Sequence, residues 1–406
     1  MFVHTEPSTI YVSPDGTGDG STEETSTELQ NALSPTGVIP GDSIILAGGT
    51  YYGDYVMQKD GTQILPITIS AKAGESPKID GSLLINGDNV IWRGTEIMYS
   101  GWTKRETLIA GSSPSDIQFK TITINGAGSY LEDCIIHDLA QGPGWWADAI
   151  NSKIRRCIIY NNGWEGPDRG HGHSVYTQNN TGIKTIEDCI LFQSFSTGLK
   201  IYTEGQYAQG YLCRRNIMFN AAILSSRDDY QMNEWVQDHY GTGYTFEDEH
   251  TYHSDPTFDP VRIGLYDGAG GVTLRDCYYP EGLVLHEDTE ILENSGGTYT
   301  KPESGKHIFV NPVSETKAHV AVYNWDLGDS VVVDLSTVTG LSIGDTVSVK
   351  NVQDLFVDIV ELVLDADKKI TVDMRAVNHT VAAPVLWDAP VTTFPEFGCF
   401  IIEKVV

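Results

Sequence analysis

A short motif recurs through the middle of the chain, and no other feature limits the fold as strongly. It consists of an apolar residue, two polar or charged residues, a cysteine and two apolar or aromatic residues. The four copies are residues 131–136, 154–159, 186–191 and 274–279. In two further copies, Asn216 and Thr95 occupy the cysteine position. Successive copies are 39, 23, 32, 27 and 61 residues apart, and the repeat is expected to pause between residues 227 and 271.

A constant motif at irregular spacing is typical of stacked coils that share their strands and differ in their loops. A coil that cannot bury its own apolar side must stack on its neighbours. Cys134, Cys157, Cys189 and Cys277 would then form a column in the core, about 4.8 Å apart. A free cysteine behaves there as a small apolar residue, and disulfides along such a column have poor geometry. We therefore expect structural cysteines, and the absence of a Cys-x-x-Cys pair argues against that kind of zinc site.

The N-terminal residues predict a segment that caps such a stack. Residues 10–16 and 41–51 have the pattern of strands, and residues 26–33 predict a short helix opened by a Ser/Thr cap. A helix at this place would cover the open end of the stack, where unpaired backbone groups promote aggregation. Frequent glycine, with 41 of 406 residues, also favours an all-β chain with many turns.

The stretch YVSPDGTGDG followed by GDSIILAGGTYYG resembles the opening of right-handed parallel β-helix proteins of the pectate-lyase-like superfamily. The resemblance extends loosely over residues 8–300, concerns the fold, and includes no catalytic motif of a particular family. It implies a right-handed single-stranded parallel β-helix, which we place with its N-terminal cap at residues 1–300. Strand patterns at 319–325, 330–335, 346–349, 369–374 and 397–403 then predict a C-terminal antiparallel β-sandwich at residues 301–406.

The charge pattern limits the class of partner. A formal net charge of −29 disfavours nucleic acid and anionic membranes, and no apolar run reaches the roughly 18 residues that span a bilayer. Residues 153–227, however, carry nine Lys/Arg against five Asp/Glu. This basic segment either binds an anionic ligand or forms ion pairs on the strand surface.

Residues 163–204 contain the only His-x-His in the chain and two similar strands, 172–178 and 198–204, offset by 26 residues. Alternate residues of a strand share a face, and we expect Val175 and Ile201 to point inward. The outward residues of the two strands would then stack on each other. The preceding coil, at residues 148–151, would place Asn151 beneath Tyr176. The predicted outer face comprises Asn151, Tyr176, Gln178, Lys200, Tyr202 and Glu204, with His171 and His173 at its edge and Arg227 on the next coil.

These residue types suit a polysaccharide lyase. Elimination across a uronic acid needs a cation for the carboxylate, a base for the C5 proton and an acid for the leaving oxygen. The cation would be Lys200, Arg227 or Arg169; the base His173 or Lys200; the acid Tyr176 or Tyr202. Substrate binding is assigned to Asn151, Arg169, His171, Gln178, Glu204 and Trp235. The expected ligand is an acidic polysaccharide.

Other chemistry stays open. A glycoside hydrolase would need two carboxylates about 5.5 Å or 6.5–9.5 Å apart, and no pair among Asp148, Glu165, Asp168 and Glu204 is fixed by spacing. His171 and His173 could share a metal ion, but no third ligand follows at a telling spacing. The cofactor is unknown, with Ca²⁺ a candidate at the acidic turns 227–229 and 254–256.

A non-catalytic role is the alternative from a different class: a glycan-binding or structural protein such as a phage tail spike, fibre or virion decoration subunit. Residues 1–7 have neither the basic nor the apolar region of a secretion signal. We expect an extracellular or virion-associated protein, with homo-oligomerisation left open. Aromatics between residues 227 and 271 would either stack on sugar rings or cover the flank of the stack: Tyr230, Trp235, Tyr240, Tyr244, Phe246 and Tyr252.

Overall fold

The computed structural model describes residues 4–111, 113–202, 208–226, 241–258, 261–264 and 266–405, together with the backbone of 235–237. The chain divides into two compact units, Met1–Thr298 and Tyr299–Val406. None of the helices in the described part of the chain has the length and apolar character needed to cross a membrane.

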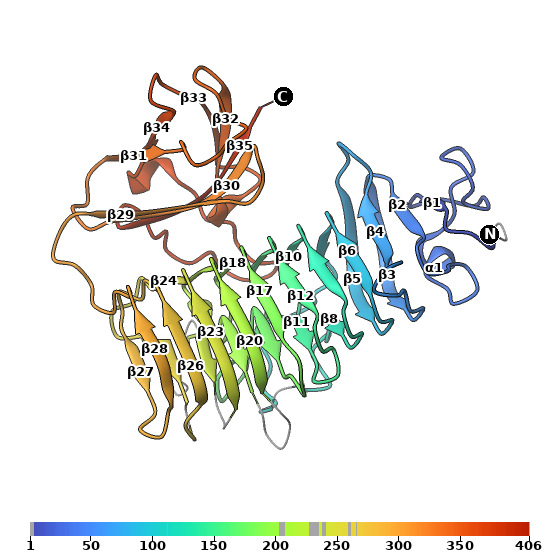
Figure 1. Ribbon diagram of the computed structural model, residues 1–406, viewed down its shortest axis with the longest axis horizontal. Helices are drawn as coiled ribbons and strands as arrows, with labels where there is room; N and C mark the ends of the chain where they lie inside the picture. The colour runs from blue at the N-terminus through green and yellow to red at the C-terminus, as the bar shows by residue number, and fades with distance from the viewer. Residues whose placement is uncertain are drawn as a thin grey trace. The chain divides into compact units, whose positions relative to one another are not determined.

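The first unit is a parallel β-helix built from three sheets (Figure 1). The first sheet has eleven strands, each parallel to its neighbours. In spatial order they are β1 (Thr9–Val12), β2 (Ser43–Leu46), β4 (Ile67–Ala71), β6 (Val90–Arg93), β9 (Tyr130–Glu132), β12 (Lys153–Arg155), β17 (Lys184–Glu187), β20 (Gln209–Arg214), β23 (Thr242–Glu247), β26 (Gly270–Arg275) and β28 (Ile291–Ser295).

The second and third sheets start from one pair of long strands, β3 (Gly49–Met57) and β5 (Pro77–Ile85). One half of β5 pairs with β7 and the other half with β8, so the two sheets diverge from this point. The second sheet contains β7 (Glu96–Met98), β10 (Ile135–His137), β13 (Ile158–Tyr160), β18 (Ile190–Phe192), β21 (Ile217–Phe219) and β24 (His250–Tyr252). The third contains β8 (Thr121–Ile124), β11 (Gln141–Trp145), β16 (Val175–Thr177), β19 (Leu199–Ile201), β22 (Trp235–Gln237), β25 (Val261–Ile263) and β27 (Leu283–Leu285).

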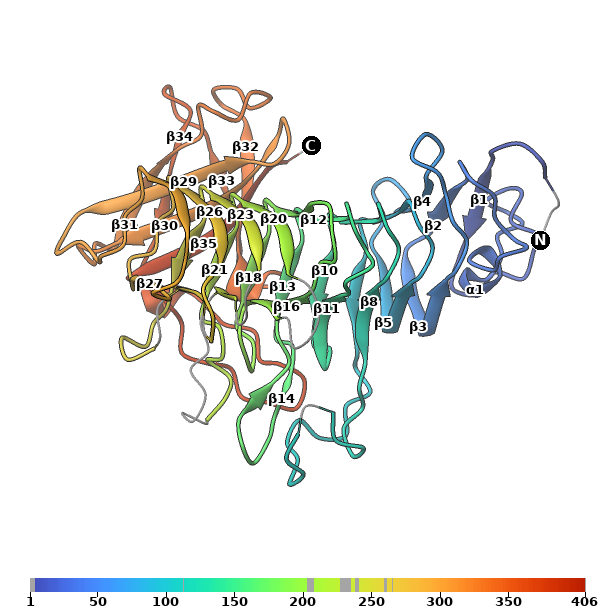
Figure 2. The ribbon, with the colours of Figure 1, turned by 60° about the horizontal axis from the view of Figure 1, so that its bottom comes forward.

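Long connections leave the helix where the second and third sheets diverge. The connection after β7 spans residues 99–120, and the one after β13 spans residues 161–174. The latter contains an antiparallel pair, β14 (Trp164–Glu165) and β15 (Gly170–His171). Both connections project from the same side of the helix in Figure 2. Insertions at this one corner leave the strand ladders of the neighbouring coils in register.

The cysteine column is present at the corner between the first and second sheets. Its members are each at most 1% exposed: Thr95, Cys134, Cys157, Cys189, Asn216, Glu249 and Cys277. The residue before each has a positive φ, as in Gly94, Asp133 and Asp188, which turns the chain sharply from one sheet into the next. All six cysteines of the chain are free and buried. The prediction of structural core cysteines is confirmed.

Asn216 fills the cysteine position with a full set of hydrogen bonds. Its Oδ1 accepts from the backbone N–H of Cys189 at 2.9 Å, and its Nδ2 donates to the carbonyl of Ile186 at 3.0 Å. Its backbone N–H and Nδ2 also donate to Oε1 of Glu249, at 3.1 and 2.9 Å. A polar residue is stable in this column only because its neighbours in the stack supply partners.

The predicted pause of the repeat between residues 227 and 271 is wrong. A further coil lies there, with Glu249 in the cysteine position and strands β23, β24 and β25. Tyr244 and Phe246, 0% and 2% exposed, fill its interior, and the Tyr244 ring stacks on Tyr211 at 5.8 Å. Tyr252 is also buried. These three aromatics belong to the coil itself, whereas Tyr230, Tyr240 and the side chain of Trp235 lie outside the described residues.

Charged side chains of alternating sign run along the first sheet. In register order they are Glu132, Arg155, Glu187, Arg214, Glu247 and Arg275. Arg155 lies 2.6 Å from Glu132, and Arg214 lies 2.6 Å from Glu187. A neighbouring column pairs Arg156 with Asp133 and Arg215 with Asp188, each at 2.7 Å. Four arginines of the basic segment are thus engaged in ion pairs along the strands, where unlike charges in adjacent positions attract.

Aromatic rings stack along the second sheet in the same way. His137 lies 4.9 Å from Tyr160, Tyr160 lies 4.9 Å from Phe192, and Phe192 lies 4.8 Å from Phe219, all nearly parallel. The strand register places these residues directly above one another. Ring stacking of this kind adds to the stability gained from their burial.

The N-terminal segment forms one end of the β-helix, with α1 (Leu29–Ala32) beside β1 and β3 (Figure 1). The predicted Ser/Thr cap is wrong, because Glu28 is the N-cap residue and makes no side-chain capping bond. Ser26 instead lies within hydrogen-bond distance of Ser13, with 2.7 Å between the two Oγ atoms.

The second unit consists of antiparallel sheets over one apolar core, as predicted. The larger sheet contains, in order, β29 (Lys306–Pro312), β30 (Lys317–Asn324), β35 (Phe397–Lys404), β32 (Thr346–Asn351) and β33 (Ile359–Val363). β31 (Ser330–Asp334) pairs with β34 (Lys369–Asp373). Two 3-10 turns, Val352–Asp354 and Ala376–Asn378, complete it. Val320 and Val347 of the larger sheet share a core with Val331 and Val372 of the pair.

Glu249 makes the stability of the first unit depend on pH. Burial raises the pKa of its carboxyl to about 8, against about 4.5 when exposed. Between these values the unfolded chain ionises and the folded chain does not, so stability falls by about 1.4 kcal/mol per pH unit. Glu249→Gln keeps an oxygen acceptor for Asn216, and its amide does not titrate. We expect its thermal midpoint to rise above that of the wild type increasingly between pH 5 and pH 8.

The matched control for this measurement is Glu287→Gln, an exposed carboxylate in the turn after β27. Its thermal midpoint, measured over the same pH range, is the reference for removing a carboxylate at the surface. A constant offset between Glu249→Gln and the wild type across the same range would contradict the buried, protonated carboxyl.

Candidate functional site

The candidate site lies on the outer face of the third sheet, where β16 and β19 are adjacent. Tyr176 pairs in register with Lys200, and Thr177 pairs with Ile201. The predicted offset of 26 residues is therefore wrong, since the observed offset is 24. An even shift preserves which side chains face inward, so Val175 and Ile201 are both buried as predicted.

Asn151 does not belong to this face. The coil before β16 is supplied by β11, in which Gly144 pairs with Tyr176. Asn151 lies at a corner with φ 55°, and its Oδ1 accepts from the backbone N–H of Ile183 at 3.1 Å. The prediction for Asn151 is wrong because residues 148–151 form the corner between β11 and β12, not a strand.

Five side chains form a cluster that we call the Trp146 patch: Trp146, His173, Tyr176, Lys200 and Tyr202. The Tyr176 ring lies at its centre, 5.5 Å from Trp146, 5.6 Å from His173 and 5.9 Å from Tyr202. The Nζ of Lys200 is 5.4 Å from the centre of the Tyr202 ring. Trp146 is 37% exposed, so a flat aromatic surface faces the solvent beside a cation.

Gly144 has no side chain, and the indole of Trp146 lies beside it. A Cβ on Gly144 would approach the Trp146 ring to 3.4 Å and the Gln141 amide to the same distance. The column that contains Tyr176 and Lys200 therefore has an empty position one coil below them, and the tryptophan ring lies against it.

Lys184 fixes the backbone beneath the patch. Its side chain is fully buried, and its Nζ donates to the carbonyl oxygens of Trp145, Trp146 and Gln178 at 3.0, 2.7 and 2.6 Å. Burial lowers the pKa of this lysine well below its usual value. Its three donors are all used, so Lys184 ties the ends of β11 and β16 together.

His173 has a ring nitrogen without a hydrogen-bond partner. Its Nδ1 is buried and has no hydrogen-bond partner among the described residues. Burial, and then the positive charge of Lys200 and Arg169, lowers the pKa of His173 well below 6.5. The imidazole is therefore neutral at neutral pH.

His171 belongs to a different environment from His173. It is 4% exposed, stacks on Trp164 at 5.1 Å and lies 3.2 Å from Asp168, measured from its Nε2 to Oδ1. Arg169 lies 3.2 Å from the other oxygen of Asp168. Gly172, with φ 88°, turns the chain between the two histidines, so they do not share a strand face.

Glu165 and Asp255, considered above for other chemistry, have ordinary hydrogen-bond partners, whereas the turn 227–229 lies outside the described residues. Oε1 of Glu165 accepts from the backbone N–H and Oγ of Ser226 at 3.1 and 2.8 Å. Oδ1 of Asp255 accepts from the backbone N–H and Oγ1 of Thr257, which stabilises the turn. Across the described ranges, no group of three His, Cys, Asp or Glu side chains is placed to hold a metal ion.

The remaining predicted site residues are less completely placed. Gln178 follows β16, beside Tyr202, whose backbone N–H donates to the carbonyl of Thr177 at 3.2 Å. Arg227 and Glu204 lie outside the described residues. The backbone of Trp235 pairs with Leu199, but its side chain is not described.

Sequence reasoning missed Trp146 and Lys184. The adjacent pair Trp145-Trp146 carried a usable signal, because neighbouring residues of a strand face opposite sides. Trp145 is 1% exposed and Trp146 is 37% exposed. Lys184 gave no such signal, since its partners are backbone carbonyls of other coils.

Comparison with known proteins supports the fold. Residues 68–213 match the family model described as a right handed beta helix region. The expected right-handed parallel β-helix is thereby confirmed. No curated protein matches the sequence.

Several solved structures are similar at low sequence identity. The pectate lyase Pel9A has a TM-score of 0.47 at 13% identity, over 73% of this chain and 79% of that one. An alginate lyase from Paenibacillus sp. strain FPU-7 has a TM-score of 0.44 at 14% identity, over 73% of this chain and 98% of that one. Tailspike protein gp49 of Acinetobacter baumannii bacteriophage Fri1, a capsular polysaccharide depolymerase, has a TM-score of 0.35 at 9% identity, over 93% of this chain and 81% of that one.

The pKa of His173 can be measured directly by nuclear magnetic resonance. We expect its ring signals, assigned by their loss in His173→Gln, to titrate well below pH 6.5. Lys200→Ala removes a nearby positive charge and should raise this pKa. Lys153→Ala, on the first sheet, is the control and should leave it unchanged. A midpoint near 6.5 in the wild type would contradict the burial of this histidine.

Proposed function

We propose that the Trp146 patch binds an acidic polysaccharide and cleaves it by β-elimination. The observation that carries this proposal is a neutral imidazole with an unpartnered nitrogen, held beside a phenol and an ammonium group on an exposed aromatic face. These are the base, acid and cation that elimination next to a carboxylate requires.

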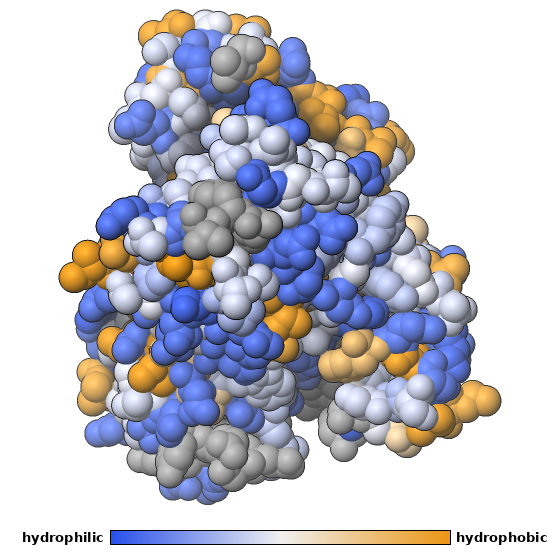
Figure 3. Space-filling model, turned by 90° about the vertical axis from the view of Figure 1, so that its right-hand side faces the viewer, coloured by the Kyte–Doolittle hydropathy of each residue, from blue (hydrophilic) through white to orange (hydrophobic). Residues whose placement is uncertain are grey.

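Recognition would combine stacking and charge. The Tyr176 ring lies 5.5 Å from the Trp146 ring and 5.9 Å from the Tyr202 ring. Such a row of rings can pack against the apolar faces of sugar units. Lys200 supplies the local positive charge in a chain of net charge −29. The face of the molecule that Figure 3 shows is largely hydrophilic with scattered apolar groups.

In the proposed reaction Lys200 neutralises the uronate carboxylate and so stabilises the negative charge that develops at C5. His173 takes the C5 proton, and the electron pair of that C–H bond forms the C4–C5 double bond. The C4–O4 bond breaks, and Tyr176 gives its phenolic proton to the leaving oxygen. Proton transfer from His173 back to Tyr176, directly or through water, restores the site.

Hydrolysis fits the patch less well. A glycoside hydrolase ordinarily uses two carboxylates, and the five residues of the Trp146 patch include none. Glu165 and Asp168 are engaged with Ser226 and with His171 and Arg169, respectively. Binding without cleavage, as in a tail spike, fibre or decoration subunit, would use the same aromatic and cationic groups and is distinguished by the absence of turnover.

The reaction class is tested with a panel of uronate polysaccharides. We expect ultraviolet absorbance of the unsaturated product and new reducing ends to appear together. Lys200→Ala should lower kcat/KM by roughly 100-fold, because the developing charge loses its counter-ion. The control is Lys153→Ala, which removes a cation 5.3 Å from the Tyr130 ring on the first sheet. Reducing ends without absorbance would indicate hydrolysis. The absence of both signals would refute the proposal that the protein is an enzyme.

Two aromatic variants separate chemistry from binding. Tyr176→Phe removes only the hydroxyl and should lower kcat by roughly 100-fold with little change in KM. Trp146→Ala removes a stacking surface worth about 1 kcal/mol and should mainly raise KM. The assignment of Tyr176 as the acid is wrong if Tyr176→Phe retains full turnover in steady-state kinetics.

A further inference from the structure

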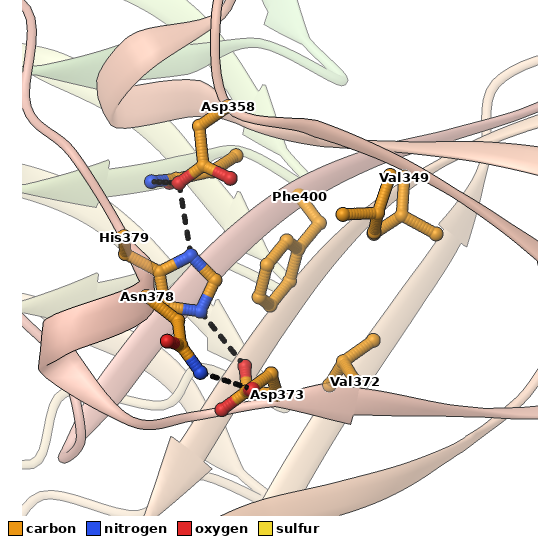
Figure 4. A pocket seen from close by; sticks show the side chains of 9 residues that line it. Val349, Asp358, Val372, Asp373, Asn378, His379 and Phe400 are labelled. Atoms are coloured by element: carbon orange, nitrogen blue, oxygen red, sulfur yellow. Dashed lines mark hydrogen bonds and ion pairs between the residues drawn. The ribbon is translucent and has the colours of Figure 1, made fainter.

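A cavity of about 280 Å³ opens in the C-terminal unit, with walls from β32, β33, β34 and β35 (Figure 4). Ligand pockets usually measure roughly 300–1,000 Å³, so this cavity has room for one small molecule. Its apolar wall includes Val349, Val372 and Phe400, and its polar wall includes Asp358, Asn378 and His379.

His379 carries a positive charge in this cavity. Its Nδ1 lies 2.9 Å from Oδ2 of Asp358, and its Nε2 lies 3.0 Å from the backbone carbonyl of Asp373. Both partners are acceptors, so both ring nitrogens must carry a proton. Burial opposes this charge, but the two hydrogen bonds raise the pKa of His379.

The charges that line the cavity are balanced. Asp358 pairs with His379, and Oδ2 of Asp373 lies 2.5 Å from the guanidinium of Arg375. An anionic ligand would meet two carboxylates, and a cationic ligand would meet two cations whose partners are already in place. Because neither sign of charge finds an unpaired counter-ion, the cavity favours a neutral ligand.

The polar wall still offers hydrogen bonds. Oδ2 of Asp358 accepts from His379, from Asn351 at 2.9 Å and from the backbone N–H of Thr380 at 3.3 Å. No described residue donates to Oδ1 of Asp358, which lies on the side of Phe400 in Figure 4. Asn378 donates to Asp373 at 2.6 Å, and its own carbonyl oxygen can accept.

A neutral sugar ring matches this combination. Its hydroxyl groups both donate and accept, so they can use the acceptor of Asp358 and the amide of Asn378, while its C–H face packs against Val372 and Phe400. We infer that the cavity of the C-terminal unit binds a single neutral sugar residue. This binding site does not depend on the chemistry proposed for the Trp146 patch.

The test uses the full chain and three matched sets of hexoses. D-glucose, D-galactose and D-mannose are each compared with the corresponding uronate and amino sugar by saturation-transfer nuclear magnetic resonance and calorimetry. We expect at least one neutral hexose to bind more tightly than both of its charged counterparts.

Three variants place this binding in the cavity. Val360→Trp, at a half-exposed position of β33 that lines the cavity, should weaken binding about tenfold or more by filling the space. Val363→Trp, an exposed position of the same strand outside the cavity, is the control and should bind as the wild type does. Asn378→Ala, at an exposed position, should also weaken binding if the amide contacts the sugar.

Three results would overturn the inference: no neutral hexose binds, the charged sugars bind equally well, or Val360→Trp binds as tightly as the wild type. Thermal melting of each variant excludes loss of folding as the cause of weaker binding.

Discussion

Every column of side chains in the β-helix follows from one constraint, the parallel stacking of coils in register at the spacing of neighbouring strands. A residue type placed at one position is brought against the same position of the next coil. Cysteines therefore form a buried column, charges must alternate in sign as in Glu132, Arg155 and Glu187, and rings stack as in Tyr160 and Phe192. Departures such as Asn216 and Glu249 persist because the neighbouring coil supplies hydrogen bonds.

The same constraint separates the long loops of the β-helix from its strand ladders. The long connections after β7 and β13 leave where the second and third sheets diverge, outside the strand ladders. The Trp146 patch lies on the outer face of the third sheet, and its backbone is held by Lys184, which reaches three carbonyl groups of other coils. A buried ammonium group is costly unless all its donors are used, and here three backbone carbonyl groups accept from it.

Much of the fold was predictable because it is repeated. The cysteine position was visible in four copies, and the five strands expected in the C-terminal unit are present, although β29 and β33 were not predicted. The coil at Glu249 was missed because a carboxyl replaces the cysteine and aromatic residues replace aliphatic ones. In the candidate site, Tyr176, Lys200, Tyr202 and His173 do lie together, but Asn151 does not, since pairing of particular strands depends on loop length.

By itself the sequence determined the all-β class, the stacking of coils and which side chains of β16 and β19 face outward, because alternation along a strand is a local property. Only the tertiary structure decided that Tyr176 pairs with Lys200 and that Trp146 lies beside it. It also decided that His171 and His173 have separate partners, and that β33 and β34 enclose a cavity with balanced charges. These relations join residues from different coils or sheets, and the lengths of the intervening loops set them.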